Sequence, residues 1–141
     1  MGSLDIKDII VTPVGRIATT SGDVLHIMKK DDVGSVGFGE VYFSWINTGA
    51  VKAWKRHTRM TMNVVVPVGQ VRFVFYVNDV SGFRVEEIGE NNYARITVPP
   101  GIWFGFQNLA ESKSLLLNLA SIPHEPTEVD RQAIKDIKYN W

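Results

Sequence analysis

Cysteine is absent from the 141-residue sequence, which excludes disulfide bonds, cysteine-ligated zinc and a thiol nucleophile together. A run of about 18 apolar residues is also missing, so we expect no membrane-spanning helix. The N-terminus has no charged segment followed by an apolar stretch, and this predicts a chain without a signal peptide. Together these absences favour a cytoplasmic protein with no membrane partner.

Net charge is absent as well, because 15 lysines and arginines balance 15 aspartates and glutamates. Without an overall positive field, we expect no nucleic-acid partner. The charge is nevertheless uneven, since residues 52–59 hold four lysines and arginines and no acidic residue. Any preference for an anionic ligand is therefore expected to be local to this stretch.

What the sequence has instead is a series of short strand-like segments separated by turn signals. At least eight segments have the β-branched and aromatic content of strands, among them residues 40–46, 62–68 and 71–77. No long helical pattern interrupts them, and residues 128–134 predict at most two helical turns before an irregular tail. The length suits one domain, residues 1–141, and the pattern predicts an all-β sandwich or barrel.

The basic stretch, residues 49–63, is typical of a turn followed by a strand. Because strand side chains alternate between faces, Ala53, Lys55, His57 and Arg59 are predicted to share one face. Such a face suits the wall of a cavity that holds an anionic or carbonyl-bearing ligand. A solvent-exposed basic strand explains the same pattern equally well.

Two spacings resemble the motifs of the cupin family. In the first, Gly49 is followed after five residues by Lys55-Arg56-His57 and later by Gly69. In the second, residues 99–108 keep the spacing Pro-x-Gly-x-x-His-x-x-x-Asn, with Phe104 at the histidine position. This resemblance implies a small jelly-roll barrel, the double-stranded β-helix of cupins.

The closer resemblance is to the dTDP-4-dehydrorhamnose 3,5-epimerase-like branch of cupins. Segments that look like that branch occur at residues 38–44, 51–63, 98–106, 122–126 and 137–141, and so cover nearly the whole chain. The resemblance implies a nucleotide-sugar ligand, a homodimer and a role in surface polysaccharide biosynthesis.

The positions of the metal ligands differ from those of metal-binding cupins. Such cupins use two histidines and a glutamate from the first motif and one histidine from the second. Here Lys55 replaces the first histidine, Thr61 or Met62 stands at the glutamate position, and Phe104 replaces the last histidine. His57 alone is left of a set that needs three or four converging ligands. We therefore expect no metal and no cofactor.

Epimerases of this branch remove a proton next to a ketone, stabilise the enolate and return a proton on the other face. The resemblance places their histidine base at Lys55 and their tyrosine donor near Leu117 or Asn118, where this chain has no tyrosine. A buried lysine with a lowered pKa could act as the base, or its ammonium could hold the enolate. Asn118 also lies in an apolar run, where its amide needs partners.

These considerations give a set of candidate residues and three candidate functions. The predicted catalytic residues are Lys55 and His57, and the predicted substrate-binding residues are Arg59, Asn63, Tyr42, Tyr76, Asn118 and Arg72. The first candidate function is metal-independent epimerisation or isomerisation of a nucleotide-linked 4-keto-6-deoxy sugar. The alternatives are a non-catalytic cupin that binds a sugar nucleotide and a structural partner of another sugar enzyme.

Overall fold

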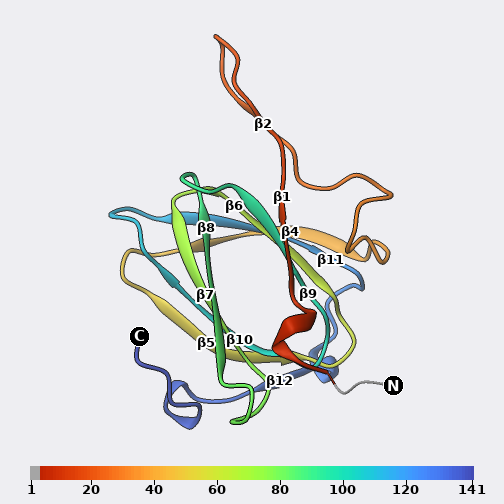
Figure 1. Cartoon of the computed structure of the whole chain (residues 1–141), viewed down its shortest axis with the longest axis vertical. Coiled ribbons are helices and arrows are strands. Elements are labelled where there is room, and N and C mark those ends of the chain that lie inside the picture. Colours follow the sequence, from red (N-terminus) through yellow and green to blue (C-terminus); the bar gives the residue numbers. More distant parts are fainter. Residues whose placement is uncertain (1–3) are drawn as a thin grey trace.

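The computed structural model describes residues 4–141, which form two five-stranded antiparallel sheets that close into a barrel (Figure 1). One sheet has the strand order β1-β9-β6-β11-β4 and the other β12-β5-β10-β7-β8. A hairpin formed by β2 and β3 stands away from the barrel. The predicted all-β cupin jelly roll is thus confirmed. Residues 1–3 lie outside the described residues, and they belong to the N-terminal stretch for which no signal peptide is predicted.

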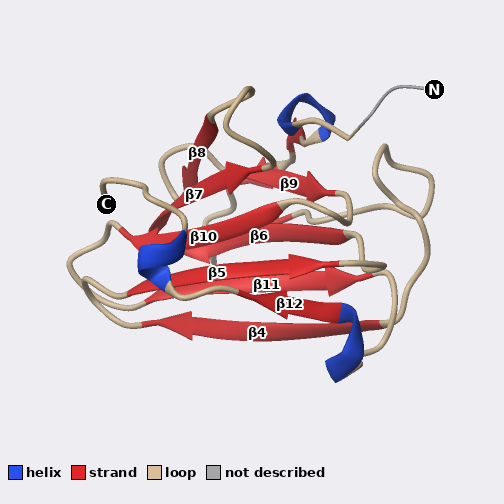
Figure 2. Ribbon diagram, turned by 90° about the horizontal axis from the view of Figure 1, so that it is seen from below, coloured by secondary structure: helices blue, strands red, loops and turns tan. Residues whose placement is uncertain are grey.

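The strands of the described chain are short, and the helices are single 3-10 turns (Figure 2). The strands are β1 (Ile10–Pro13), β2 (Arg16–Ile17), β3 (Val24–Leu25), β4 (Glu40–Ile46), β5 (Val51–His57), β6 (Met62–Val68), β7 (Gln70–Tyr76), β8 (Phe83–Gly89), β9 (Ala94–Val98), β10 (Trp103–Asn108), β11 (Ser114–Ala120) and β12 (Val129–Arg131). The 3-10 turns are η1 (Ile6–Asp8), η2 (Pro126–Glu128) and η3 (Ile134–Asp136). Within residues 4–141, no helix has the length and apolarity needed to cross a membrane.

Strand predictions from composition are confirmed at residues 40–46 and 62–68, which form β4 and β6. The tight turn predicted after β6 is centred on Gly69, whose φ of +89° is readily adopted by glycine. The helical turns predicted at residues 128–134 are found only at the two ends of that range, in η2 and η3, and are wrong for the residues between them. Val129–Arg131 instead form β12, because they pair with the otherwise free edge of β5.

The interior of the barrel is filled from both sheets. Inward-facing aliphatic and aromatic side chains, such as Ile46, Val66, Phe75 and Ile96, are almost completely buried. Burial of each such side chain stabilises the fold by about 1.5–3 kcal/mol. These residues occupy alternate strand positions, which fixes which face of each strand points inward.

The outer faces of the two sheets are covered to different extents. The outer face of the second sheet is covered by the C-terminal residues, where Ile137 packs with Trp54, Val74 and Trp103. On the first sheet, the outer face of the edge strand β4 exposes three large side chains. The exposed fractions of Val41, Phe43 and Trp45 are 49%, 63% and 54%.

Candidate active site

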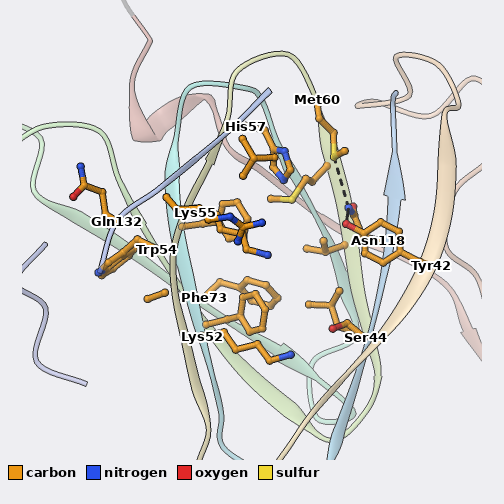
Figure 3. Close-up of a pocket in the computed structure, with 18 of the residues that line it drawn as sticks. Tyr42, Ser44, Lys52, Trp54, Lys55, His57, Met60, Phe73, Asn118 and Gln132 are labelled. Atoms are coloured by element: carbon orange, nitrogen blue, oxygen red, sulfur yellow. Dashed lines mark hydrogen bonds between the residues drawn. The ribbon is translucent and has the colours of Figure 1, made fainter. Parts of the chain in front are cut away.

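A cavity of about 430 Å³ lies inside the barrel, with walls from both sheets (Figure 3). Most of its polar side chains come from β4, β5, β11 and β12, and β6, β7 and β10 contribute only apolar side chains. No acidic side chain of the described residues lines it. The polar and sulfur-bearing lining residues include Tyr42, Ser44, Lys52, Lys55, His57, Met60, Asn118, His124 and Arg131.

The β5 wall departs from regular alternation. Opposite β10, Phe104 pairs with Lys55 and Phe106 pairs with Lys52, with a register shift between Phe104 and Gly105. Phe104 and Phe106 both line the cavity, so Lys52 and Lys55 share the inner face although they are three residues apart. A β-bulge at this point accommodates the extra residue, and Trp54 is buried on the outer side.

His57 is held by a buried carboxylate. Its Nδ1 hydrogen bonds to Oε1 of Glu128, a residue that is 1% exposed. The other carboxylate oxygen accepts hydrogen bonds of 3.2 Å from the backbone N–H groups of Arg59 and Met60. The carboxylate therefore fixes the orientation of the imidazole and leaves Nε2 as the nitrogen for the cavity.

The pKa of Glu128 reflects two opposing influences. Burial alone raises the pKa of this carboxyl, whereas the hydrogen bond from His57 and those from two backbone N–H groups lower it. The net shift is downward, so Glu128 is ionised at neutral pH. An ionised partner on Nδ1 favours the tautomer with hydrogen on Nδ1, which leaves the lone pair of Nε2 free in the neutral ring.

Lys55 stands in a positively charged environment. Burial lowers its pKa from the ordinary lysine value, and the charges of Arg131 and Lys52 lower it further. Arg131 on β12 pairs directly with Lys55 across the strands, so the two side chains lie on the same face. This cluster of cations favours an anionic ligand or an oxygen that becomes negative during a reaction.

The facing wall carries neutral polar groups. Tyr42 on β4 pairs with Asn118 on β11, and the Asn118 Nδ2 donates a 3.0 Å hydrogen bond to the Tyr42 hydroxyl. The Oδ1 of Asn118 is buried without a hydrogen-bond partner in residues 4–141. A phenol is thus held across the cavity from the basic strand, beside an amide oxygen that still requires a donor.

Aromatic rings form the base of the cavity between these walls. The His57 ring stacks on Phe104 with centroids 5.8 Å apart and an interplanar angle of 14°. Phe73 and Phe106 continue this surface, with centroids 5.6 Å apart. Apolar surroundings exclude water and strengthen electrostatic interactions with a bound ligand.

Four of the eight predicted site residues meet in this cavity. Lys55 and His57 lie on one wall, and Tyr42 and Asn118 lie on the other. The predicted common face of β5 is therefore correct for Lys55 and His57. It is wrong for Ala53, which the bulge places outward opposite Gly105.

The other four predicted residues lie outside the cavity. Arg59 follows the end of β5 and forms an ion pair with the exposed Glu125. Asn63 faces outward on β6, where it donates to the Gly34 carbonyl and accepts from the Thr97 hydroxyl.

Arg72 and Tyr76 lie on the outer face of β7, because Val71, Phe73 and Phe75 occupy its inner face. Arg72 binds Glu87 and Gln107, and the Tyr76 hydroxyl donates to Asp79. The structure therefore does not bring these side chains to the cavity.

Three residues of the site were not predicted from the sequence, namely Lys52, Glu128 and Arg131. Regular alternation places Lys52 on the opposite face from Lys55, and nothing in a local pattern reveals a bulge. Glu128 lies 71 residues from His57, in a segment predicted as helical. The excess of basic residues at 52–59 was the one available signal for Lys52.

The residues at the ligand positions of metal-binding cupins do not suit a metal ion. His57 is already bonded to Glu128, and Lys55 and Phe104 supply no metal ligand. In residues 4–141 no group of three His, Asp or Glu side chains could hold a metal ion. The absence of a metal from the reaction stays a prediction.

Comparisons with known proteins place this geometry in context. No protein-family model matches the chain. The structure of a dTDP sugar isomerase from Desulfovibrio desulfuricans G20 superposes with a TM-score of 0.86 and 32% identity, covering 92% of this chain and 86% of the other. The dTDP-4-dehydrorhamnose 3,5-epimerase of Sulfolobus tokodaii superposes with a TM-score of 0.81 and 18% identity, covering 98% and 84%.

A sequence relative comes from Haloferax volcanii and is named "Probable low-salt glycan biosynthesis epimerase Agl13". It is 26% identical over 137 residues, which cover 92% of this chain and 88% of the relative. The similarity therefore extends over nearly the full length of both proteins.

Proposed function

The chain belongs to the cupin family of dTDP-sugar isomerases and epimerases, and we propose that it acts without metal on a nucleotide-linked 4-keto-6-deoxy sugar. The observation that carries this proposal is the His57–Glu128 pair, which faces a cavity with a cationic wall. A base oriented by a buried carboxylate suits proton abstraction, and nearby ammonium groups suit the enolate that results.

In the first step His57 Nε2 takes a proton from the carbon next to the ketone. The electron pair of the C–H bond forms a carbon–carbon double bond, and the ketone oxygen becomes an enolate oxygen. The ammonium of Lys55 neutralises that oxygen, so the lysine at the family's base position acts as the electrophile.

In the second step a proton returns to carbon. Tyr42 lies on the opposite wall, and a proton from its hydroxyl reaches the face of the enolate away from His57. Protonation on that face inverts the carbon; the phenolate then regains a proton from solvent, and the His57 imidazolium releases its proton to solvent. If His57 instead delivers its proton to the former carbonyl carbon, and the hydroxyl on the neighbouring carbon passes its proton to the former carbonyl oxygen, the ketone moves to the neighbouring carbon and the product is a keto isomer.

Solvent exchange tests this proposal directly. The protein is incubated in D₂O with a dTDP-linked 4-keto-6-deoxy sugar, and deuterium at the carbons beside the ketone is followed by NMR and mass spectrometry. We expect exchange in the unmodified protein and its loss in His57→Asn. Binding of the sugar nucleotide without exchange would support the non-catalytic cupin, and absence of both would support the structural partner.

The biological setting is also a proposal. The name of the Haloferax relative supports a role in glycan or surface polysaccharide biosynthesis. A cytoplasmic location stays a prediction. The pathway role is tested by deleting the chromosomal copy and comparing the sugar composition of the surface polysaccharide.

Homodimer formation is proposed from the exposed outer face of β4, where Val41, Phe43 and Trp45 present an apolar strip. Strips of this kind on one edge strand suit a self-complementary contact between two copies. Light scattering on the unmodified protein and on Phe43→Ser tests this, with a halved mass expected for the variant. A monomeric mass for the unmodified protein contradicts the dimer.

A further inference from the structure

The bulge in β5 changes the chemistry of the cavity by one side chain. In a regular strand with Lys55 and His57 inward, Ala53 would also face inward and Lys52 would face outward. The extra residue at the bulge reverses this order, so that the Lys52 ammonium enters the cavity and donates a 3.3 Å hydrogen bond to the Trp45 carbonyl. An ammonium has three donors, so two remain for a ligand.

The outer side of the bulge is held by the C-terminal segment, residues 132–141. Trp54 exchanges two backbone hydrogen bonds of 3.1 Å with Gln132, and its indole N–H donates to the Ile134 carbonyl at 3.3 Å. Its ring packs on Trp141 with centroids 5.4 Å apart. The ring of Tyr139 then meets Trp141 edge-on at 4.9 Å.

A glycine opposite the bulge permits this packing. Gly105 on β10 pairs with Ala53, and a Cβ at Gly105 would lie 2.7 Å from the Ala53 Cβ and 3.0 Å from the Trp141 ring. Such distances are too short for carbon atoms, so Trp141 or the bulge would have to move. The close approach therefore couples the C-terminal segment, the bulge and β10 in one packed unit.

We propose that the C-terminal segment, through Trp141 and Trp54, is a positioning element that keeps Lys52 turned into the cavity for the diphosphate of the bound nucleotide. The positioning role rests on the proposed function, because it assumes that the ligand is a nucleoside diphosphate. Trp54 is 1% exposed, and its burial on the outer face is what holds the extra residue out of the barrel. Without that contact β5 can return to regular alternation, which turns Lys52 away.

A double-mutant cycle on ligand affinity tests the proposal. Thymidine diphosphate is titrated by calorimetry into the unmodified protein, Lys52→Met, Trp141→Ala and the double variant, all well below their melting temperatures. We expect each single change to weaken binding about tenfold, the loss of one charge-assisted contact. Because Trp141 acts through Lys52, the double variant should bind no more weakly than Lys52→Met alone.

Two further variants separate positioning from general stability. Trp141→Phe keeps an aromatic ring on Trp54 and should restore most of the affinity. Gly105→Ala disturbs the same contact from the opposite strand and should weaken binding as Trp141→Ala does. If Trp141→Ala does not fold, Gly105→Ala takes its place in the double-mutant cycle. Phe38→Ala, which removes an exposed aromatic ring, is the matched control with unchanged affinity.

Additive effects in the cycle, or a lowered melting temperature in Trp141→Ala with unchanged affinity, overturn the proposal. Failure of the unmodified protein to bind thymidine diphosphate overturns it too. Because the readout is binding without turnover, its result is independent of catalysis. If the protein shows no solvent exchange but the double-mutant cycle gives the expected non-additive result, the proposed enzymatic function is wrong and the positioning role is retained.

Discussion

The two walls of the cavity differ in charge. The wall built by β5 and β12 carries the side chains that are cationic or basic, whereas the wall built by β4 and β11 carries a hydroxyl, a phenol and an amide. The first set is Lys52, Lys55, His57 and Arg131, and the second is Ser44, Tyr42 and Asn118. In the proposed mechanism this difference separates binding of negative charge and proton removal from proton return, and it allows each to be tested alone.

The largest effect should follow loss of the base on the cationic wall. His57→Asn keeps a polar side chain beside Glu128 but cannot accept the substrate proton, so kcat should fall about 10³–10⁴-fold. Deuterium exchange at the carbon beside the ketone should fall in parallel. His26→Asn is the matched control, because His26 lies on the hairpin side of the molecule and does not line this cavity. Retained exchange in His57→Asn would place the base elsewhere.

The second largest effect concerns Lys55 and carries a pH signature. Lys55→Met removes the charge that neutralises the enolate, which should lower kcat about 10²–10³-fold. Because burial and two neighbouring cations lower its pKa, the unmodified enzyme should lose activity on the alkaline side before an ordinary lysine titrates. Lys55→Arg should move that limb to higher pH. Activity that instead rises as Lys55 deprotonates would make Lys55 the base.

The same lysine should also affect stability with a defined sign. The pKa of Lys55 is lower in the folded chain than in the unfolded chain, so between the two values the unfolded chain binds more protons. The free energy of unfolding should therefore rise with pH across that window. Lys55→Met should remove this rise, and urea titrations at several pH values measure it.

On the neutral wall, Tyr42→Phe should separate exchange from inversion. His57 still removes the proton, so deuterium exchange should persist, whereas formation of the inverted product should fall about 10²-fold. Tyr76→Phe is the matched control, since that hydroxyl lies on the outer face of the barrel and binds Asp79. Equal loss of exchange and inversion in Tyr42→Phe would mean that the phenol binds substrate instead of donating the proton.

Part of this site could be predicted from the sequence, because strand periodicity is local. The spacing of Lys55 and His57 placed them correctly on a common face, and the polar Asn118 within an apolar run indicated a special environment. Periodicity shows which residues share a face but not which face is inward. Asn63, Arg72 and Tyr76 were predicted to bind substrate, although each has partners on the outside of the barrel.

The remaining members of the site depend on contacts that no local pattern contains. Lys52 faces inward because of a bulge, and the bulge depends on Trp54 packing against residues near the C-terminus. Glu128 reaches His57 because β12 pairs with β5, which brings distant segments together. A strand of three residues with no alternating pattern gives too weak a signal to predict that pairing.

The smallest catalytic effect should come from Glu128, which touches the base and not the substrate. Glu128→Gln can still accept a hydrogen bond but loses the charge that orients and strengthens His57, so kcat should fall about 10–100-fold with little change in KM. Glu125→Gln is the matched control, because Glu125 is exposed and pairs with Arg59 outside the cavity. A fall as large as that of His57→Asn would show that the carboxylate itself takes part in proton transfer.

Glu128 should also set the acid limit of folding. Its pKa is lower in the folded chain than in the unfolded chain, so its contribution to stability is complete above the unfolded value of about 4.3 and is lost as pH falls through the folded value. In Glu128→Gln this acid loss should be smaller, and the free energy of unfolding at neutral pH should drop by about 1–3 kcal/mol, since a charged acceptor is replaced by a neutral one. Urea unfolding at neutral pH and at the acid limit measures both quantities. If Glu128→Gln loses as much stability at acid pH as the unmodified protein, another carboxylate governs acid unfolding. The His57–Glu128 pair would then matter for catalysis alone.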